Sequence, residues 1–311
     1  MVTCHGMNEL RIIFMGTPEF AVPSLEALVE NKFDVVAVVT APDKPQGRGQ
    51  KLIPSPVKEC ALKHGIPVLQ PTHLKSVEFL EELKTFRANL QVVVAFRMLP
   101  ETVWSMPVLG TINLHASLLP QYRGAAPINW AIIHGEKETG VTTFFLKHEI
   151  DTGSIIFQER EPIEENDSAG SLYERLMKKG GQLVVKTVRA IETGEYPSLP
   201  QAETGEVKNA PKIYRETCEI RWTQTARQVR NFVRGLSPYP AAWTILNGKT
   251  YKIFDVSIAL HQKECNPGEF TTDNKNYLYV KVLDGWISIN EFQPEGKRKM
   301  SVREFLAGNK I

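Results

Sequence analysis

The first half of the chain alternates between short apolar runs and stretches in which apolar residues recur at helical spacing. Four runs have the length and composition of buried strands: 10–14, 35–39, 90–94 and 111–114. Phe20, Leu25 and Leu28, between the first two runs, are spaced as on one face of a helix. Apolar strands separated by helices pair in parallel, with helices on both faces. The pattern predicts a doubly wound, Rossmann-like α/β sheet.

The pattern changes near residue 200. A helical stretch over 171–192 is followed by a polar segment with several prolines, and then by a helical stretch over 222–234. Short alternating runs follow, such as 251–254 and 277–282, and Asn-Gly and Asp-Gly pairs mark turns between them. We predict a catalytic domain in 1–200, a linker in 201–213 and a smaller OB-like β-barrel in 214–311.

Composition narrows the class of protein. The 311 residues are 42% hydrophobic and 23% charged, which is typical of a globular protein. No apolar run approaches the length of about 20 residues that a membrane helix needs, so we expect a cytoplasmic protein, and a monomer. The four cysteines form no Cys-x-x-Cys pair, so we expect neither a metal site nor a disulfide framework.

The charge is unevenly distributed. Residues 1–200 hold 20 Lys and Arg against 23 Asp and Glu, whereas residues 201–311 hold 17 against 12. The last third is therefore basic and favours a polyanionic partner. Solvated lysines spread over a domain explain the same excess.

Three polar residues are candidates for chemistry. Asn113 and His115 stand two apart at the end of a predicted strand, so both side chains point to one face. Asp151 follows in an Asp-Thr-Gly sequence. Taken alone, His115 could be a hydrogen-bonded core imidazole and Asp151 a turn former.

The surrounding sequence gives these residues a more specific interpretation. Residues 113–124 read Asn-Leu-His-Ala-Ser-Leu-Leu-Pro-Gln-Tyr-Arg-Gly, and Asp-Thr-Gly follows at 151–153. This text resembles the folate-dependent formyltransferase family. The resemblance implies that 10-formyltetrahydrofolate is the co-substrate, that no metal takes part, and that Asn113, His115 and Asp151 are catalytic. Formyl transfer to an amine develops an oxyanion, which needs donors such as Asn113 and His115.

The same resemblance implies a folate site. In the family the loop that corresponds to Ser117, Leu118, Leu119 and Pro120 forms one wall of the pocket, and the run 93–100 forms the other wall. Arg97 and Leu99 in that run are expected to contact folate. The run departs from the family branch that acts on tRNA, because Phe96-Arg97 stands where that branch has Tyr-Gly.

The segment at 41–58 points to the acceptor of the formyl group. It is rich in glycine and proline and carries Lys44, Arg48 and Lys51, which suit a phosphate backbone. It resembles the insertion of the branch that formylates methionyl initiator tRNA. We expect Lys44, Arg48 and Lys51 to bind tRNA, and the loop to be mobile until tRNA orders it. A plain solvated loop is the alternative.

Other functions fit parts of the sequence. Sugar-nucleotide formyltransferases share the Asn, His and Asp. Glycinamide ribonucleotide formyltransferases need a phosphate cradle after the first strand, where Pro18 removes an N–H and Glu19 adds negative charge. A dinucleotide oxidoreductase needs a Gly-x-Gly-x-x-Gly spacing that is missing here. A catalytically idle RNA-binding module would not need the three candidate residues.

Overall fold

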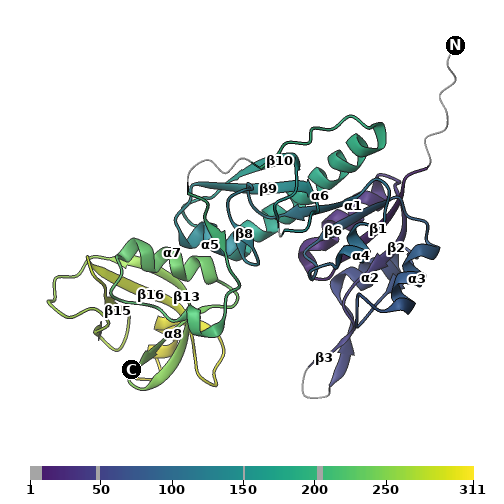
Figure 1. Cartoon of the computed structure of the whole chain (residues 1–311). Coiled ribbons are helices and arrows are strands. Elements are labelled where there is room, and N and C mark those ends of the chain that lie inside the picture. Colours follow the sequence, from purple (N-terminus) through teal and green to yellow (C-terminus); the bar gives the residue numbers. More distant parts are fainter. Residues whose placement is uncertain (1–8, 47–49, 150, 202–205) are drawn as a thin grey trace, which may run out of the picture. The chain divides into compact units, whose positions relative to one another are not determined.

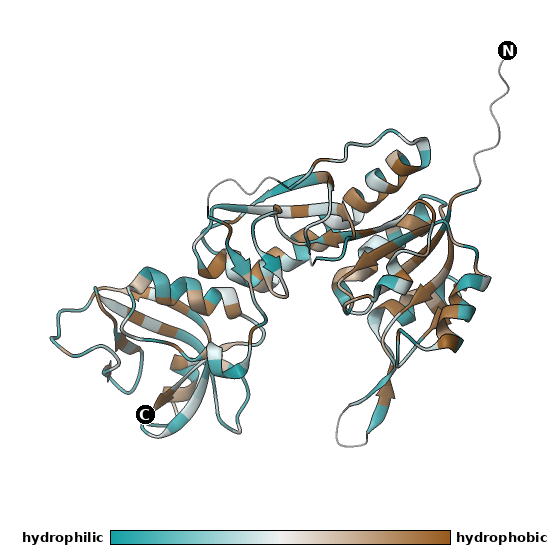
Figure 2. Ribbon diagram, in the orientation of Figure 1, coloured by the Kyte–Doolittle hydropathy of each residue, from teal (hydrophilic) through white to brown (hydrophobic). Residues whose placement is uncertain are grey.

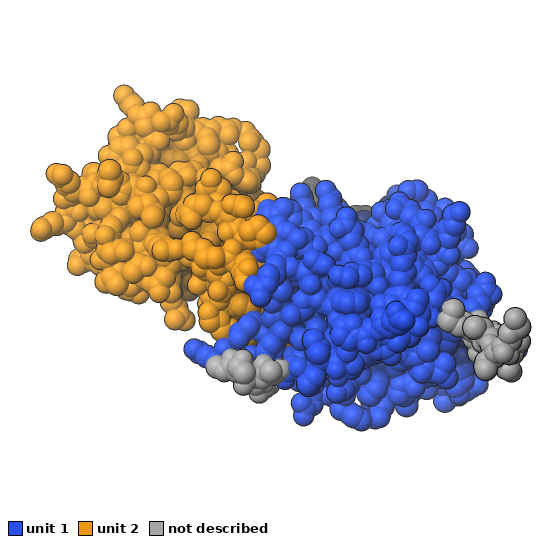
Figure 3. Space-filling view, turned by 90° about the horizontal axis from the view of Figure 1, so that it is seen from above, with its two compact units in different colours: residues 1–121, 140–161, 174–207 blue, residues 122–139, 162–173, 208–311 orange. Residues whose placement is uncertain are grey.

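The computed structural model describes residues 9–46, 50–149, 151–201 and 206–311. The chain forms two compact units, which Figure 3 colours separately. The first contains residues 1–121, 140–161 and 174–207, and the second contains 122–139, 162–173 and 208–311. The two units therefore do not divide the chain at a single point near residues 200–214. Two segments of the predicted catalytic domain, 122–139 and 162–173, belong to the second unit.

Seven strands form the main sheet of the first unit, in the order β10-β9-β7-β6-β1-β2-β5 (Figure 1). They are β1 (Arg11–Gly16), β2 (Asp34–Val39), β5 (Val68–Leu69), β6 (Leu90–Val94), β7 (Thr111–His115), β9 (Glu138–Phe145) and β10 (Ile155–Pro162). β1 lies parallel to β2 and β6, and β6 lies parallel to β7. The four predicted apolar runs are thus confirmed as parallel strands.

The sheet is parallel-dominated and mixed, since β9 runs antiparallel to β7. Its chain order reverses beside β1: β2 and β5 lie on one side, and β6 and β7 lie on the other. Ligands of doubly wound sheets bind at the carboxyl ends of the strands beside such a reversal. The end of β7, where Asn113 and His115 lie, is therefore a favourable place for a site.

Helices cover this sheet: α1 (Val22–Glu30), α2 (Pro56–Lys63), α3 (Val77–Thr85), α4 (Glu101–Trp104) and α6 (Ala169–Thr193), with the short 3-10 turn η1 (Glu19–Ala21) ahead of α1. The central strands are almost wholly apolar, as their brown colour in Figure 2 shows. Ile12, Phe14 and Ile112 are completely buried. Serine side chains cap α2 and α3, since Ser55 and Ser76 accept hydrogen bonds from backbone N–H groups of the first turn.

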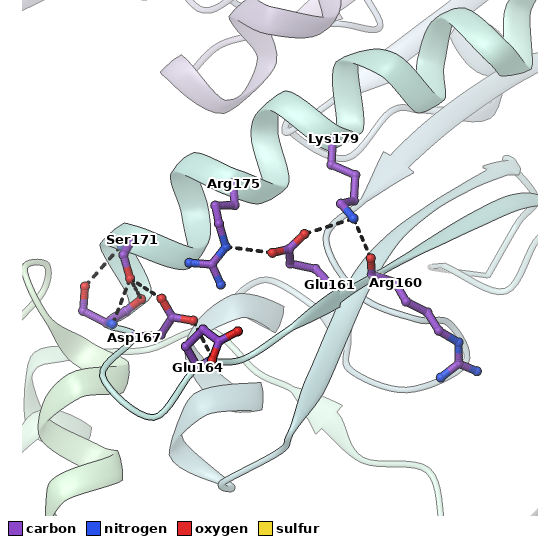
Figure 4. A network of polar contacts seen from close by, with 8 residues as sticks. Arg160, Glu161, Glu164, Asp167, Ser171, Arg175 and Lys179 are labelled. Carbon is purple, nitrogen blue, oxygen red and sulfur yellow. Dashed lines mark hydrogen bonds and ion pairs between the residues drawn. The ribbon is translucent and has the colours of Figure 1, made fainter.

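A buried carboxylate joins β10 to α6 (Figure 4). Glu161 is 8% exposed; it accepts a hydrogen bond of 2.7 Å from Arg175 Nε and lies 3.0 Å from Lys179 Nζ. Burial raises the pKa of Glu161, but the hydrogen bonds from Arg175 and Lys179 outweigh burial and hold that pKa below its ordinary value. The ionised carboxylate thus stabilises the fold.

Glu161→Gln is expected to lower the free energy of unfolding at neutral pH by about 1–3 kcal/mol, since it replaces the ionised acceptor of Arg175 and Lys179 with a neutral amide. A lowered pKa contributes stability above the unfolded value of about 4.3, and this contribution is lost as the pH falls through the folded pKa. The gap between the variant and the wild type should therefore close below pH 4 in urea titrations. Glu159→Gln is the control, because its pair with Lys186 is half exposed. Equal losses in both variants would contradict the assignment.

The second unit contains a curled antiparallel sheet in the order β12-β13-β16-β15-β14, with β17 beside β16. Its strands are β12 (Ala242–Leu246), β13 (Lys249–Ala259), β14 (Phe270–Thr272), β15 (Leu278–Lys281), β16 (Trp286–Pro294) and β17 (Met300–Ser301). Within 206–311, no pairing joins the edge strands β12 and β14. The predicted C-terminal β-domain is confirmed, as a half-barrel.

The helix α7 (Ala226–Leu236) begins four residues later than the predicted stretch at 222. Thr225 accepts a hydrogen bond from Gln228 N, and the Gln228 side chain accepts one from Thr225 N. This reciprocal cap fixes the start of the helix. Trp222 lies before it and donates to Thr244 Oγ1 at 3.0 Å. A shorter helix, α8 (Val302–Leu306), contributes Val302, Phe305 and Leu306 to the hydrophobic core of the second unit.

Close packing against α7 explains why residues 122–139 belong to the second unit. The helix α5 (Pro127–Ile133) packs on α7 at Gly235, where a Cβ would lie 2.6 Å from Ile133 Cγ1. Asn129 Nδ2 donates to Gly235 O at 2.8 Å. The strands β8 (Arg123–Gly124) and β11 (Asn209–Ala210) pair in parallel and tie the same segment to the predicted linker.

Arginines of α7 hold the other internal segment, 162–173. Arg230 donates to Glu165 Oε1 at 2.6 Å, and Arg234 donates to the carbonyl oxygens of Glu164 and Asp167. These two arginines are counted in the basic excess of the last third, yet they serve internal contacts. The charge available for an anionic partner is correspondingly smaller than the composition indicates.

None of the helices formed by the described residues is both long enough and apolar enough to cross a membrane.

Candidate active site

The three predicted catalytic residues lie in the first unit, and two of them form a buried pair. His115 ends β7, and its Nδ1 lies 3.7 Å from Asp151 Oδ2; the two side chains are 8% and 10% exposed. Asn113 stands two residues earlier on β7, is half-buried, and pairs with Val93 of β6. The two-residue spacing places Asn113 and His115 on the same face of the sheet. The structure thus brings the imidazole and the carboxylate together at the strand end.

The turn that carries Asp151 depends on its neighbours. Asp151 adopts a φ of 55°, a left-handed conformation that aspartate tolerates better than most residues. At Gly153 an added Cβ would lie 1.5 Å from Phe145 O, so the backbone there excludes every side chain. The glycine of the Asp-Thr-Gly motif is therefore a condition for this turn to pack against β9.

Gln201 also holds this turn, which sequence reasoning missed. Its Nε2 donates to Asp151 O at 2.6 Å and to Gly153 O at 2.9 Å. The residue stands 50 positions after Asp151, at the start of the predicted linker. No local sequence signal marks such a distant amide as part of the site.

The loop Ser117–Pro120 follows β7 and is fixed from β9 and β10. Thr142 Oγ1 donates to Ser117 O at 2.6 Å and accepts from Leu119 N at 3.2 Å. Gln158 Nε2 donates to Leu119 O at 2.9 Å. The Ser117 hydroxyl is completely buried and donates to Gln121 O at 2.6 Å. Leu118 and Pro120 are only partly buried, so these two side chains have surface available for a ligand.

Thr142→Val is expected to lower kcat by about tenfold or more, because it loosens the loop beside His115 while nearly keeping the side-chain volume. It should also cost about 1–3 kcal/mol of stability, since Leu119 N loses its partner. Thr143→Val is the matched control. Thr143 Oγ1 pairs with Thr187 Oγ1 on the other face of β9, so that variant should lose stability and keep its kcat. Equal kcat in the two variants would remove Thr142 from the site.

The second group of predicted folate residues lies after β6. Arg97 is exposed and donates to Thr72 O at 2.9 Å and also to Pro71 O. Its guanidinium carbon stands 5.7 Å from the centre of the Phe96 ring. Leu99 is partly buried against the core beneath β6. The carbonyl contacts fix Arg97 in place, and its role toward folate stays a prediction.

Two short strands pair within the basic segment, where the sequence predicted a loop that is mobile until tRNA binds. Strands β3 (Lys44–Gln46) and β4 (Lys51–Ile53) pair antiparallel, with Pro45 opposite Leu52. A ribbon of two strands has two free edges, so proline is tolerated in it. Leu52 is 62% exposed. Arg48, predicted to contact tRNA, lies outside the described residues.

Lys58, a further cation of this segment, has a structural partner. Its Nζ donates to Asp43 Oδ2 at 2.7 Å and to Gln70 Oε1 at 2.8 Å. The hydrogen bonds from Lys58 and Gln70 hold the pKa of Asp43 below its ordinary value. These contacts join the base of the hairpin to the first turn of α2. Lys44 and Lys51 remain as the described cations that the hairpin itself carries.

The turn after β1 bears on competing functions. A Cβ at Gly16 would lie 2.7 Å from Ala21 Cβ and 3.0 Å from Val94 O. Gly16 thus permits close packing of β1, β6 and η1. Pro18 and Glu19 follow it, and Pro18 caps η1 without a side-chain hydrogen bond. This turn offers a poor cradle for a phosphate or a pyrophosphate.

Comparison with known proteins decides the family. The sequence profile described as formyl transferase matches residues 10–188, and the profile of the formyl transferase C-terminal domain matches residues 212–310. The chain belongs to the formyl transferase family. A relative from Bacteroides fragilis, named methionyl-tRNA formyltransferase, is 53% identical over 309 residues, which cover 97% of this chain and 95% of the relative.

Solved structures share the fold at lower identity. The sugar 3N-formyl transferase WlaRD, crystallised in the presence of dTDP and 5-N-formyl-THF, matches with a TM-score of 0.68 over 94% of this chain and 100% of its own, at 24% identity. Methionyl-tRNA formyltransferase from Clostridium thermocellum matches with a TM-score of 0.55 over 80% of this chain and 94% of its own, at 15% identity. These structural matches show the fold and leave the acceptor open.

Proposed function

We propose that this formyltransferase transfers the formyl group of 10-formyltetrahydrofolate to the amino group of methionine carried by initiator tRNA. The observation that carries the proposal is the identity of 53% over 97% of the chain to a methionyl-tRNA formyltransferase. The buried His115–Asp151 pair at the end of β7 supports the proposal further, because it offers groups that suit this reaction. We further propose that the protein acts as a monomer in the cytoplasm.

The reaction forms a bond between the amine nitrogen and the formyl carbon, and breaks the bond between that carbon and the folate nitrogen. The folate supplies the one-carbon unit. The amine loses a proton, the folate nitrogen gains one, and negative charge builds on the formyl oxygen in the transition state. Asn113 Nδ2 provides a donor for that oxygen, and His115 Nε2 becomes a second donor once the ring has taken the proton of the amine.

Asp151 acts through His115 in this mechanism. A carboxylate beside Nδ1 favours a proton on that nitrogen, which leaves Nε2 to face the substrates. Asp151 also stabilises the imidazolium if the ring takes the proton of the attacking amine. The interatomic distance of 3.7 Å is longer than a hydrogen bond, and catalytic contacts often tighten when substrate binds.

The folate site is proposed between two walls of the first unit. One wall is the loop Ser117–Pro120, whose backbone is held by Thr142 and Gln158. The other is the segment after β6 that carries Arg97 and Leu99. The apolar faces of Leu118 and Leu99 suit an aromatic ring, and Ser117 contributes through the loop backbone because its hydroxyl is committed to Gln121 O.

For tRNA we propose the hairpin β3–β4 and the basic surface of the second unit. In the register of the hairpin Lys44 pairs with Ile53 and Lys51 pairs with Gln46, so the two lysines lie on the same face of the ribbon. Ile53 lies on that face and is 41% exposed, whereas exposed Leu52 lies on the opposite face. Two cations flanking an apolar side chain suit a nucleic-acid end that offers both phosphates and an unstacked base.

Binding of tRNA is expected to weaken steeply as salt rises, because each neutralised phosphate releases condensed counterions. The double variant Lys44→Ala, Lys51→Ala should reduce the slope of log Kd against log salt by about two, and raise the KM for tRNA while leaving folate affinity unchanged. Lys75→Ala, another exposed cation of this unit, is the matched control and should leave the slope near the wild-type value. An unchanged slope in the double variant would remove the hairpin from the tRNA site.

The acceptor can be identified by direct competition. The protein is incubated with formyl-labelled 10-formyltetrahydrofolate and a mixture of methionyl initiator tRNA, an amino-sugar nucleotide and glycinamide ribonucleotide. We expect label on the tRNA only. Label on the sugar nucleotide or on the ribonucleotide would contradict the proposed acceptor. The assignment to the formyl transferase family would remain valid.

A further inference from the structure

Three side chains with metal-binding atoms converge between two helices of the first unit, away from the proposed active site. Glu26 belongs to α1, while Cys60 belongs to α2 and His64 caps its C-terminal end. One carboxylate oxygen, the thiol sulfur and one ring nitrogen all lie within 4.8 Å of one another. Cys60 and His64 are four positions apart, so the helix places them on the same face.

Within the described ranges of the chain, these three side chains have no other polar partner. In the part of the chain that the structure describes, none of the three takes part in a side-chain hydrogen bond or ion pair. Cys60 is buried, Glu26 is half-buried and His64 is exposed. A carboxylate beside a buried thiol is an arrangement that a cation would stabilise.

We infer that Glu26, Cys60 and His64 bind a divalent cation of borderline softness, for which Zn²⁺ is the best match. Sulfur, imidazole nitrogen and carboxylate oxygen form a donor set that Zn²⁺ favours and that Mg²⁺ and Ca²⁺ do not. Three protein ligands leave the fourth tetrahedral position to water. Binding forms a metal–sulfur bond, and the thiol proton is released to solvent.

The geometry needs only small side-chain movements. Ligand atoms around tetrahedral Zn²⁺ stand about 3.5 Å apart, given metal–ligand bonds of about 2.0–2.3 Å. Rotation of exposed His64 and half-buried Glu26 closes the remaining distance, since among the described residues no side-chain hydrogen bond or ion pair holds either of them. Buried Cys60 supplies the fixed ligand, and the exposed side of the cluster supplies the path for the ion.

The expected role is structural. A cation at this place cross-links α1 to α2, and α2 begins two residues after Pro54, where the hairpin β3–β4 returns to the body of the unit. It would thus fix the base of the hairpin and stabilise the folded chain by mass action. The site holds no residue of the proposed catalytic machinery, so formyl transfer does not require the metal.

Cobalt provides a direct test, because a cysteine thiolate bound to Co²⁺ gives a near-ultraviolet charge-transfer band. The full chain is stripped of metal, kept reduced without chelating thiols, and titrated with Co²⁺ alone. We expect the band to saturate at one equivalent, with intense visible bands of a tetrahedral site, and to disappear on addition of one equivalent of Zn²⁺. Zn²⁺ should also raise the Tm of the wild type.

Variants distinguish this site from incidental thiol binding. Cys60→Ser should abolish the charge-transfer band, and His64→Ala and Glu26→Gln should each weaken Co²⁺ binding at least tenfold. His64 is exposed, so its variant folds even where Cys60→Ser does not. Cys265→Ser removes a thiol of the second unit and should keep the band. Absence of the band in the wild type, its persistence in Cys60→Ser, or unchanged affinity in His64→Ala would overturn the site.

Discussion

His115→Ala and Asn113→Ala are each expected to lower kcat by a factor on the order of 10²–10³, which corresponds to about 3–4 kcal/mol of transition-state stabilisation. Both residues stand at the end of β7, and their side chains serve the site more than the core. KM values for folate and tRNA should change little. Steady-state formylation of methionyl initiator tRNA measures the effect, and circular dichroism checks the fold.

Combination of these substitutions sharpens the test. Members of one catalytic unit fail together, so the double variant should be little worse than the worse single variant. His73→Ala is the control, since that histidine is exposed in a loop of the same unit and should keep wild-type kcat. Near-normal turnover of folded His115→Ala, or fully additive losses in the double variant, would contradict the proposed mechanism.

Gly153→Ala is expected to reduce kcat by about 10² or more, although it leaves every proposed catalytic side chain in place. A Cβ at this position would overlap Phe145 O, so the turn must move and carry Asp151 away from His115. Misplacement of a catalytic group by about 1 Å costs about 10² in rate. Kinetics and a thermal melt together measure the effect.

The matched control is Gly285→Ala, because an added Cβ there meets open space. That variant should keep both its activity and its Tm. Gln201→Ala provides an intermediate case, since it removes two hydrogen bonds that hold the same turn without forcing the backbone to move. If Gly153→Ala kept wild-type kcat, the position of Asp151 would not matter for the reaction, and its proposed role would be wrong.

Sequence alone predicted those parts of the fold that depend on local patterns. The runs that became β1, β2, β6 and β7 are buried on both faces, so continuous apolar sequence identified them. The antiparallel direction of β9 was not predicted, because a buried strand has the same apolar pattern in either direction. Strands β3 and β4 were not predicted, because glycine and proline in this segment are typical of a loop. The two strands nevertheless pair along a short ribbon.

In the candidate site, too, the sequence indicated only the residues that lie within a local motif. Asn113, His115 and Asp151 were found because a long motif surrounds them. Thr142, Gln158 and Gln201 act through hydrogen bonds to backbone atoms that are 23 to 50 positions away, and nothing local in the sequence reports such contacts. The sequence does not indicate the Glu26–Cys60–His64 cluster for a related reason, since its carboxylate comes from a different helix and no Cys-x-x-Cys pair marks it.

We propose that His115 and its neighbours transfer the formyl group to the amino group of methionine on tRNA. The most direct measurement follows labelled formyl into methionyl initiator tRNA, releases the amino acid by mild base, and identifies it by mass spectrometry. We predict labelled N-formylmethionine from the wild type, and a rate lower by a factor on the order of 10²–10³ from folded His115→Ala. Unlabelled methionine from the wild type, or equal labelling by both proteins, would contradict the account.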